Sequence, residues 1–261
     1  MRDVALHLLS TSSLVLLGPV LFFQGRHVRR VTPRLPQAAG PQEGTIGTGP
    51  DPFRLAVVGE STAMGVGVPE HAVGLAGQTA RALGSAVGRP VRWRVLGRSG
   101  VTARALLKEF IEPAPPLEAD VVVVILGVND TLGFSSPRRW TGALDALLAS
   151  LRRRSAQAAV VLAAVPPMQL FPAFPSPLRH VLGLRAHVLD LAAIRWAGER
   201  PGVAHVPYPH SERKEIPDMF CSDGFHPSAI GYERWSAALA AAAATLLRRA
   251  ETNPHVTLRP R

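Results

Sequence analysis

The sequence predicts an α/β fold in which helices cover both faces of a parallel sheet of about five strands. Short apolar runs alternate with longer stretches of helical periodicity over roughly 200 residues. One run, 119–127, is apolar at nearly every position, which is typical of a central strand covered on both faces. The chain has 261 residues, 47% of them apolar, so a sizeable core can form and a fully disordered chain is excluded.

An apolar segment precedes this alternation and is expected to form a helix. Val4 to Phe23 carries no formal charge and, as a helix, could span roughly 30 Å of hydrocarbon. The alternatives are a secretory signal and a helix lying at the membrane surface or against the domain. The arginines that follow would keep this flank cytoplasmic and could bind anionic headgroups: Arg26, Arg29, Arg30 and Arg34. We expect residues 1–31 to attach the chain to a membrane, with the following domain on the cytoplasmic side.

The rest of the chain divides into a linker, one domain and a tail. Residues 32–53 carry five prolines among Gly, Gln and Thr, which predicts an irregular linker. We expect the domain at 54–250 and a C-terminal tail at 251–261. Strands are predicted near 55–59, 91–96, 119–127, 158–165 and 203–206. Helices are predicted near 71–87, 103–110, 137–154, 178–196 and 227–249, the third with Ser136 as its N-cap and Pro137 at its first position.

Composition and spacing exclude several function classes. The formal net charge is +10, but nearly all the basic residues are arginines and no run interleaves them with aromatic residues. No helix-turn-helix or zinc-finger spacing is present either, so we expect no nucleic-acid partner. The single cysteine, Cys221, excludes an internal disulfide and a multi-cysteine metal site. The glycines of 59–67 match neither a dinucleotide fingerprint nor a phosphate loop, so nucleotide binding is not expected.

Four segments bring polar or glycine residues to one predicted edge of the sheet, namely 59–61, 97–100, 127–130 and 221–228. In an open α/β sheet the ligand crevice lies beyond the carboxyl ends of the strands. Taken alone, Ser61 could be a turn serine that caps the next helix. The other three segments favour a catalytic site instead.

The residue types in these segments are those of nucleophilic catalysis. With the spacing Asp-x-x-His, Asp223 can hold one ring nitrogen of His226 while the other nitrogen faces Ser61. The histidine would then take the serine proton, and the attacked carbonyl would become an oxyanion that needs fixed donors. We expect three donors to converge there, namely the backbone N–H groups of Ser61 and Gly100 and the side-chain amide of Asn129.

The stretches containing Ser61, Gly100, Asn129 and Asp223/His226, in that order, resemble the four signature blocks of the SGNH, or GDSL, hydrolases. The resemblance covers about 55–250, and the closing stretch Asp-Gly-Phe-His-Pro-Ser is its most specific part. It implies an esterase, lipase or acyl hydrolase on a flavodoxin-like three-layer α/β/α sandwich that needs no metal or other cofactor. It also implies Ser61 as nucleophile, His226 as base, Asp223 as the residue orienting it, and Gly100 and Asn129 as oxyanion donors. One departure is Glu60, where the family usually has aspartate.

The natural ester is open, but one segment suggests where its acyl chain binds. Residues 166–178 are proline-rich and apolar, and we hypothesise that four of them form an acyl-chain wall or membrane-facing lip: Met168, Leu170, Phe171 and Phe174. An ordinary loop packed on the domain is the alternative. The expected partners are a small-molecule or lipid ester and a membrane, while the oligomeric state stays open. Acyl transfer to an alcohol, or a catalytically silent membrane-attached binding domain, are the alternative functions.

Overall fold

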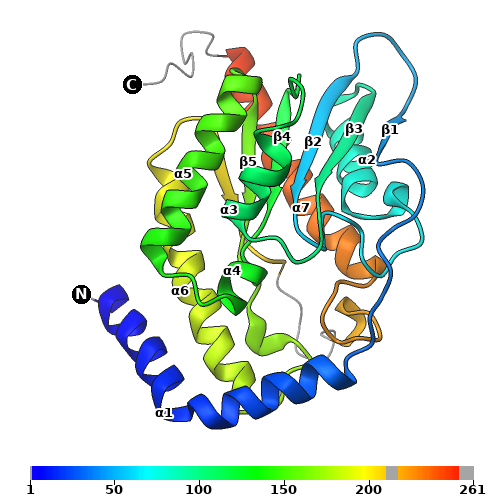
Figure 1. Ribbon diagram of the computed structural model, residues 1–261. Coiled ribbons are helices and arrows are strands. Elements are labelled where there is room, and N and C mark those ends of the chain that lie inside the picture. The colour runs from blue at the N-terminus through cyan, green and yellow to red at the C-terminus, as the bar shows by residue number, and fades with distance from the viewer. Residues whose placement is uncertain (1, 210–216, 253–261) are drawn as a thin grey trace.

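A six-stranded sheet forms the centre of the computed structural model, which describes residues 2–209 and 217–252 (Figure 1). The strand order is β1-β3-β2-β4-β5-β6. Five strands are parallel, and the edge strand β1 pairs antiparallel with β3. The strands are β1 (Glu43–Ile46), β2 (Phe53–Gly59), β3 (Val91–Gly97), β4 (Val121–Ile125), β5 (Ala159–Ala163) and β6 (Val203–Val206). The predicted α/β fold and its five parallel strands are therefore confirmed.

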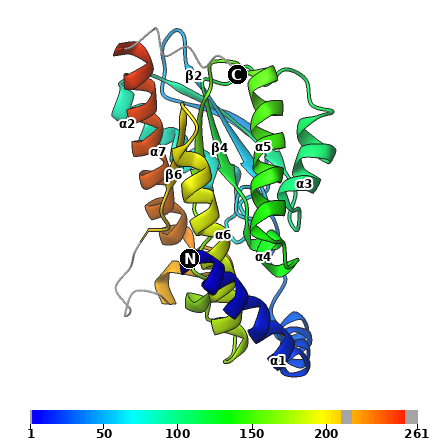
Figure 2. The same cartoon turned by 90° about the vertical axis from the view of Figure 1, so that its left-hand side faces the viewer.

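Helices cover both faces of the sheet, as the views in Figures 1 and 2 show. One face is covered by α2 (Leu75–Val87) and α7 (Ala229–Thr252). The other is covered by α3 (Ala103–Leu106), α5 (Pro137–Arg154) and α6 (Leu178–Gly198). Shorter helical turns are α4 (Val128–Leu132), η1 (His71–Val73), η2 (Leu107–Ile111), η3 (Met168–Leu170) and η5 (Pro217–Met219).

The alternation of side chains along β2 builds the two halves of the core. Leu55 and Val57 pack with α2 and α7, while Ala56 and Val58 pack with the helices on the opposite face. All four are buried, because successive residues of a strand point to opposite faces and both faces are covered. The apolar run of β2 is therefore a consequence of its central place in the sheet.

Glycines allow the strands to approach closely at their carboxyl ends. A Cβ on Gly97 would lie 1.9 Å from the carbonyl oxygen of Gly59, and a Cβ on Gly59 would lie 2.2 Å from that of Ile125. No side chain can occupy such positions, so the sequence must place glycine where β2 ends between its neighbours. This fixes the backbone immediately before Ser61.

The segment predicted to be an irregular linker, 32–53, contains β1. Gly44 of this strand lies flat against the Trp93 indole of β3, where a Cβ would come within 2.7 Å of the ring. The strand has few apolar residues of its own and alternates between exposed and half-buried positions. It is held by backbone pairing with β3, which the composition of the segment could not reveal.

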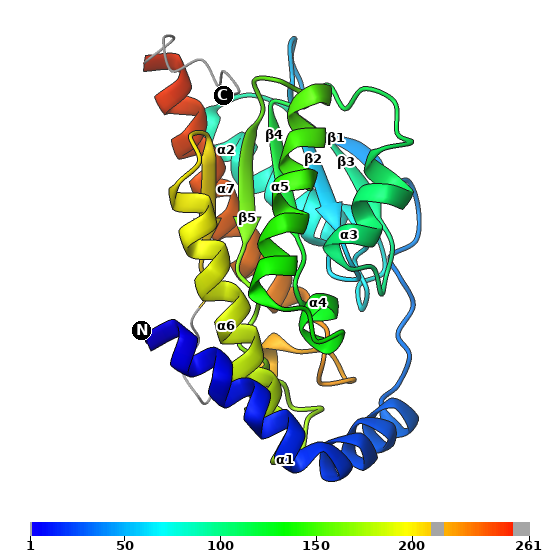
Figure 3. The ribbon, with the colours of Figure 1, turned by 60° about the vertical axis from the view of Figure 1, so that its left-hand side comes forward.

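The N-terminal helix α1 (Arg2–Val31) lies across the end of the domain where the parallel strands terminate. Figure 3 shows it as two arms that meet at a bend, and Pro19 lies inside the helix. By length and composition, Ala5–Val31 could cross a membrane, a test that signal sequences and some core helices also pass. The apolar N-terminal helix predicted from the sequence is thus present.

Candidate active site

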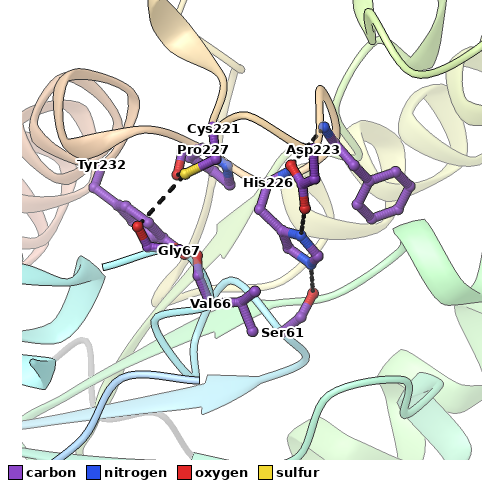
Figure 4. Close-up of polar contacts among 9 residues, drawn as sticks. Ser61, Val66, Gly67, Cys221, Asp223, His226, Pro227 and Tyr232 are labelled. Carbon is purple, nitrogen blue, oxygen red and sulfur yellow. Dashed lines mark hydrogen bonds and ion pairs between the residues drawn. The ribbon is translucent and has the colours of Figure 1, made fainter. Parts of the chain in front are cut away.

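Three side chains predicted from distant parts of the sequence lie in hydrogen-bonding contact (Figure 4). Ser61 lies two residues beyond the end of β2, and its Oγ lies 3.0 Å from Nε2 of His226. The other ring nitrogen, Nδ1, lies 2.6 Å from Oδ2 of Asp223. The structure therefore brings Ser61, His226 and Asp223 together in one line of contacts.

The turn that carries Asp223 and His226 is shaped by local hydrogen bonds. Oδ1 of Asp223 accepts from the backbone N–H groups of Phe225 and His226, at 2.9 and 3.0 Å. The backbone N–H of Cys221 donates to the carbonyl of His226, at 2.8 Å, and closes the turn. An aspartate that binds the backbone two and three residues ahead favours this conformation. Its second oxygen is left to face the imidazole.

Further contacts join this turn to the loop after Ser61. The Tyr232 hydroxyl, from the first turn of α7, donates to the carbonyl of Val66 at 2.8 Å. The Cys221 thiol lies 3.1 Å from the carbonyl of Pro227 and 3.5 Å from that of Gly67. Burial and the nearby Asp223 raise the pKa of Cys221, so its thiol stays protonated and has a structural role.

The carboxyl group of Asp223 is buried yet remains ionised. Burial raises the pKa of Asp223, but the hydrogen bonds from the His226 imidazole and from the backbone N–H groups of His226 and Phe225 outweigh it. The net result is a pKa below the ordinary value for aspartate. An anion at Nδ1 keeps the proton on that nitrogen, so Nε2 is free to accept the proton of Ser61.

Glu60, the neighbour of the serine, is a second buried carboxyl group with only 2% of its surface exposed. It accepts hydrogen bonds from the backbone N–H groups of Val128 and Asn129, at 3.0 and 3.1 Å. The side-chain amide of Asn129 also donates to it. Burial raises the pKa of Glu60 to about 8; the hydrogen bonds from Asn129 and Val128 oppose this, and the charge of Asp130 adds to it. Glu60 therefore joins the end of β2 to the start of α4.

Asp130 extends this connection to the third loop. Its carboxylate accepts from the backbone N–H of Ala103, at 3.0 Å, where α3 begins three residues after Gly100. It also accepts from the Ser135 hydroxyl at 3.4 Å, and burial raises its pKa. Two buried carboxyl groups thus connect the segments that follow β2, β4 and β3.

The three groups predicted to bind an oxyanion differ in their hydrogen-bond partners. Gly100 has φ +84°, a conformation that favours glycine, while a Cβ there would meet no atom within 4 Å. The positive φ, rather than a close approach of another backbone segment, explains why glycine occurs at this position. Within 2–209 and 217–252, the N–H groups of Ser61 and Gly100 have no protein acceptor. The Asn129 amide has two hydrogens, and Glu60 takes one of them.

A small pocket opens at Ser61 and is mostly apolar. It is lined by Ser61, Thr62, Val128, Pro166, Phe171, Tyr208, Phe220, Phe225, His226, Pro227 and Trp235. Phe225 was visible in the motif between the aspartate and the histidine, and its ring lies 4.9 Å from the imidazole. The sequence pattern did not identify Tyr208 or Trp235, because they come from separate elements that meet only in the fold.

Of the four residues predicted to form an acyl-chain wall, the structure places only Phe171 at this pocket. Met168 and Phe174 are buried in the core beside α6, and Leu170 is half-buried outside the pocket lining. Phe171 stacks on Phe174 with ring centroids 5.7 Å apart. The proline-rich segment therefore turns most of its large side chains into the domain.

Other titratable residues have structural surroundings. Among the described residues no group of three or more His, Cys, Asp or Glu side chains could hold a metal ion. His205 pairs with Asp190 at 2.8 Å, and Asp190 also accepts from the backbone of Val165. His71 is buried, His180 and His187 are exposed, and His210 lies outside the described residues.

Comparison with known proteins places this arrangement in a family. The model of the GDSL-like Lipase/Acylhydrolase family matches residues 57–234. The GDSL-like esterase Rv1075c of Mycobacterium tuberculosis (strain ATCC 25618 / H37Rv) is 30% identical over 237 residues, which cover 82% of this chain and 72% of that protein.

Solved structures share the fold at lower identity. A family 2 carbohydrate esterase with a carbohydrate binding domain from Corynascus thermopiles (Myceliophthora fergusii) has a TM-score of 0.58 at 16% identity, over 78% of this chain and 69% of that one. An extracellular lipase from Streptomyces rimosus has a TM-score of 0.52 at 15% identity, over 73% and 99%. The chain therefore belongs to the GDSL-like lipase/acylhydrolase family and is a carboxylic ester hydrolase.

Proposed function

We propose that this esterase works through a covalent acyl-enzyme on Ser61, with His226 as general base and Asp223 as the residue that orients it. The observation that carries the proposal is the line of contacts from Asp223 through His226 to Ser61 Oγ, at 2.6 and 3.0 Å. These distances are within the range that direct proton transfer requires. The family and the M. tuberculosis relative support an ester as the substrate.

The reaction has two steps. Ser61 Oγ attacks the ester carbonyl as its proton passes to Nε2 of His226, and the proton then goes to the departing alcohol. Water, deprotonated by the same nitrogen, attacks the acyl group and releases the acid and the free serine. Asp223 stays ionised throughout, because the hydrogen bonds from the His226 imidazole and from the backbone N–H groups of His226 and Phe225 outweigh burial and hold its pKa below the ordinary range, and it stabilises the imidazolium that forms in each step.

The oxyanion of both steps would be bound by the N–H groups of Ser61 and Gly100 and by the second N–H of the Asn129 amide. The two backbone groups have no protein acceptor among the described residues, and the amide has one hydrogen left over from its bond to Glu60. Glu60 and Asp130 are positioning residues in this proposal, because they fix the loops that carry the donors.

We also propose that residues 1–31 attach the enzyme to a membrane and that domain 54–250 lies on the cytoplasmic side. The support is an N-terminal helix long and apolar enough for a membrane, with Arg26, Arg29 and Arg30 exposed on its last turns and Arg34 exposed just beyond its end. The ester is a small-molecule or lipid ester that fits the apolar pocket beside Ser61.

Pre-steady-state hydrolysis of p-nitrophenyl acetate tests the acyl-enzyme. The wild-type protein should release a burst of p-nitrophenol before the steady state. Ser61→Ala and His226→Ala should each lose this burst and lower kcat by about 10⁴-fold or more. The matched control is Ser222→Ala, which changes an exposed serine on the turn that carries Asp223 and His226 and should hydrolyse the ester at the wild-type rate. Retained turnover in the folded Ser61→Ala protein would exclude this mechanism.

A further inference from the structure

The N-terminal helix has two unlike faces, and its inner face is built to hold the domain. The residues that contact the domain recur every three or four positions, the spacing of one helix stripe: Ser10, Leu14, Leu17, Leu21, Gln24 and Val28. Its four apolar members pack against the core cluster beside α6. A segment selected only for crossing lipid would not need such a stripe.

The two polar residues of the stripe make specific contacts. The Gln24 amide donates to the carbonyl of Ser176 at 2.7 Å and accepts from the backbone N–H of Leu178 at 3.1 Å. At the other end, the Arg185 guanidinium lies 3.4 Å from the Ser10 hydroxyl. Since Ser10 meets residue 185 and Gln24 meets residue 178, the directions of α1 and α6 are antiparallel where the two helices touch. The helix therefore lies flat on the domain and does not project from it.

The outer face of α1 is left uncovered and is strongly apolar. Eight of the twelve exposed large apolar side chains among the described residues are on this helix: Leu8, Leu9, Val15, Leu16, Val20, Phe22, Phe23 and Val31. Leu16 is 79% exposed and Phe23 is 68% exposed. An apolar surface of this extent requires a partner with an apolar interior.

Positively charged residues lie at the C-terminal end of this apolar helix. Arg26, Arg29 and Arg30 are exposed on the last turns of α1, and Arg34 is exposed just beyond its end. A cationic end beside an apolar helix face complements an anionic bilayer surface, where headgroups meet acyl chains.

We infer that α1 is an interfacial platform: its inner stripe stays packed on α6 while its outer face lies in the surface of an anionic bilayer. The platform lies at the end of the domain where the parallel strands terminate (Figures 1 and 3). Ser61 comes two residues after β2 and therefore lies at the same end. Gln24 binds the backbone of 176–178, shortly after Phe171 of the pocket, so the docked helix and the pocket wall belong to one connected structure. With the proposed esterase function, this favours esters dissolved in the bilayer as substrates.

Vesicle flotation of the full chain tests the platform without needing turnover. Wild-type protein should float with vesicles of phosphatidylcholine and phosphatidylglycerol, and less with phosphatidylcholine alone. Leu16→Glu/Phe23→Glu should lower the bound fraction by about tenfold or more. Ile194→Glu, at an apolar residue of α6 that is 45% exposed, is the matched control and should bind like wild type. Hydrolysis of a medium-chain p-nitrophenyl ester dissolved in the vesicles should fall with binding, while a soluble short-chain ester is hydrolysed at the wild-type rate.

Several results would overturn the inference. The first two are a wild-type protein that does not float and a double variant that floats like the wild type. The third is a wild-type protein that stays on the vesicles in alkaline carbonate, as a membrane-spanning helix would. The fourth is a vesicle-bound protein whose measured mass shows that the N-terminal helix has been cleaved off. A stable dimer in solution that the double substitution dissociates would assign the face to a second copy. If the charged variant does not fold, Leu16→Gln/Phe23→Gln replaces it with the same expectation. Absence of any Ser61-dependent hydrolysis would remove the proposed function and leave the flotation result to decide the platform alone.

Discussion

The site contains two buried carboxyl groups whose protonation the fold drives in opposite directions. Asp223 and Glu60 each accept hydrogen bonds from two backbone N–H groups and one side chain. Nevertheless the pKa of Asp223 is lowered, whereas burial raises that of Glu60 to about 8. The third donor differs: Asp223 faces an imidazole that can become a cation, while Glu60 faces a neutral amide and lies near the carboxyl group of Asp130.

In the proposed mechanism, this difference separates two tasks within one site. An ionised Asp223 can stabilise a positive charge on His226 as the serine proton moves. A Glu60 that is largely neutral at pH 7 can position Asn129 without placing a full negative charge beside a developing oxyanion. Burial dominates at Glu60, whereas at Asp223 the hydrogen bonds from His226 and Phe225 outweigh burial, so the charge of each carboxyl group depends on the balance between the two.

The largest effect is expected at Asp223. Asp223→Asn removes the anion and presents the imidazole with an amide, so kcat should fall on the order of 10³- to 10⁴-fold through the wrong tautomer of His226. Steady-state kinetics with a soluble p-nitrophenyl ester would measure it. A loss below about tenfold would show that Ser61 and His226 work as a dyad.

The oxyanion side should give the next largest effect. Asn129→Ala removes the predicted amide donor, and kcat should fall on the order of 10² to 10³ with little change in KM. Ser135→Ala removes a hydroxyl that lies 3.4 Å from Asp130 and is the nearby control, with an expected loss of less than about threefold. Wild-type kcat in Asn129→Ala would exclude this residue from the oxyanion site.

Glu60 should affect stability more than rate. Because its folded pKa of about 8 exceeds the ordinary 4.5, the folded state binds more protons between these values, and the contribution of Glu60 to the free energy of unfolding is lost as pH rises through about 8. Glu60→Gln cannot ionise, so its stability should fall less over the same range. Urea unfolding of both proteins at pH about 5 and about 8 measures the difference. Equal slopes would contradict a raised pKa for Glu60.

The smallest expected effect concerns the aromatic side of the pocket. The Phe171 ring lies 5.3 Å from that of Phe225, which sits between Asp223 and His226. Phe171→Ala should enlarge the acyl site and shift preference from short to medium-chain p-nitrophenyl esters by a few-fold, from the area exposed. Leu170→Ala, at a half-buried residue of the same segment outside the pocket lining, should leave the chain-length ratio unchanged. An unchanged ratio in Phe171→Ala would reject this residue as an acyl-chain wall.

Local spacing explains how far the sequence could predict the site. Asp223 and His226 lie in one turn whose own hydrogen bonds set their geometry, so three positions of spacing sufficed to place them together. Ser61 follows an apolar run that ends in glycine, which identified the carboxyl end of a central strand. Both signals are contained within a few residues of chain.

Features that depend on contacts between distant segments could not be predicted in this way. The hydrogen bond that the backbone at the start of α4 donates to Glu60 forms because β2 and β4 are neighbours in the sheet. The order of the strands along the chain does not predict that pairing. In the same way, the segment of β1 forms a strand because its backbone pairs with that of β3. Met168 and Phe174 face the core because α6 packs over their segment, and composition alone could not separate this packed loop from an acyl-chain wall or membrane-facing lip.

The most direct test of the central claim is covalent labelling with a fluorophosphonate, followed by mass spectrometry of the peptides. Only a serine activated by a neighbouring base reacts rapidly with this reagent. We predict one adduct per chain, on Ser61, with labelling slowed strongly in His226→Ala and unaffected in Ser222→Ala. An adduct on another residue, or no adduct on the folded wild-type protein, would contradict the account.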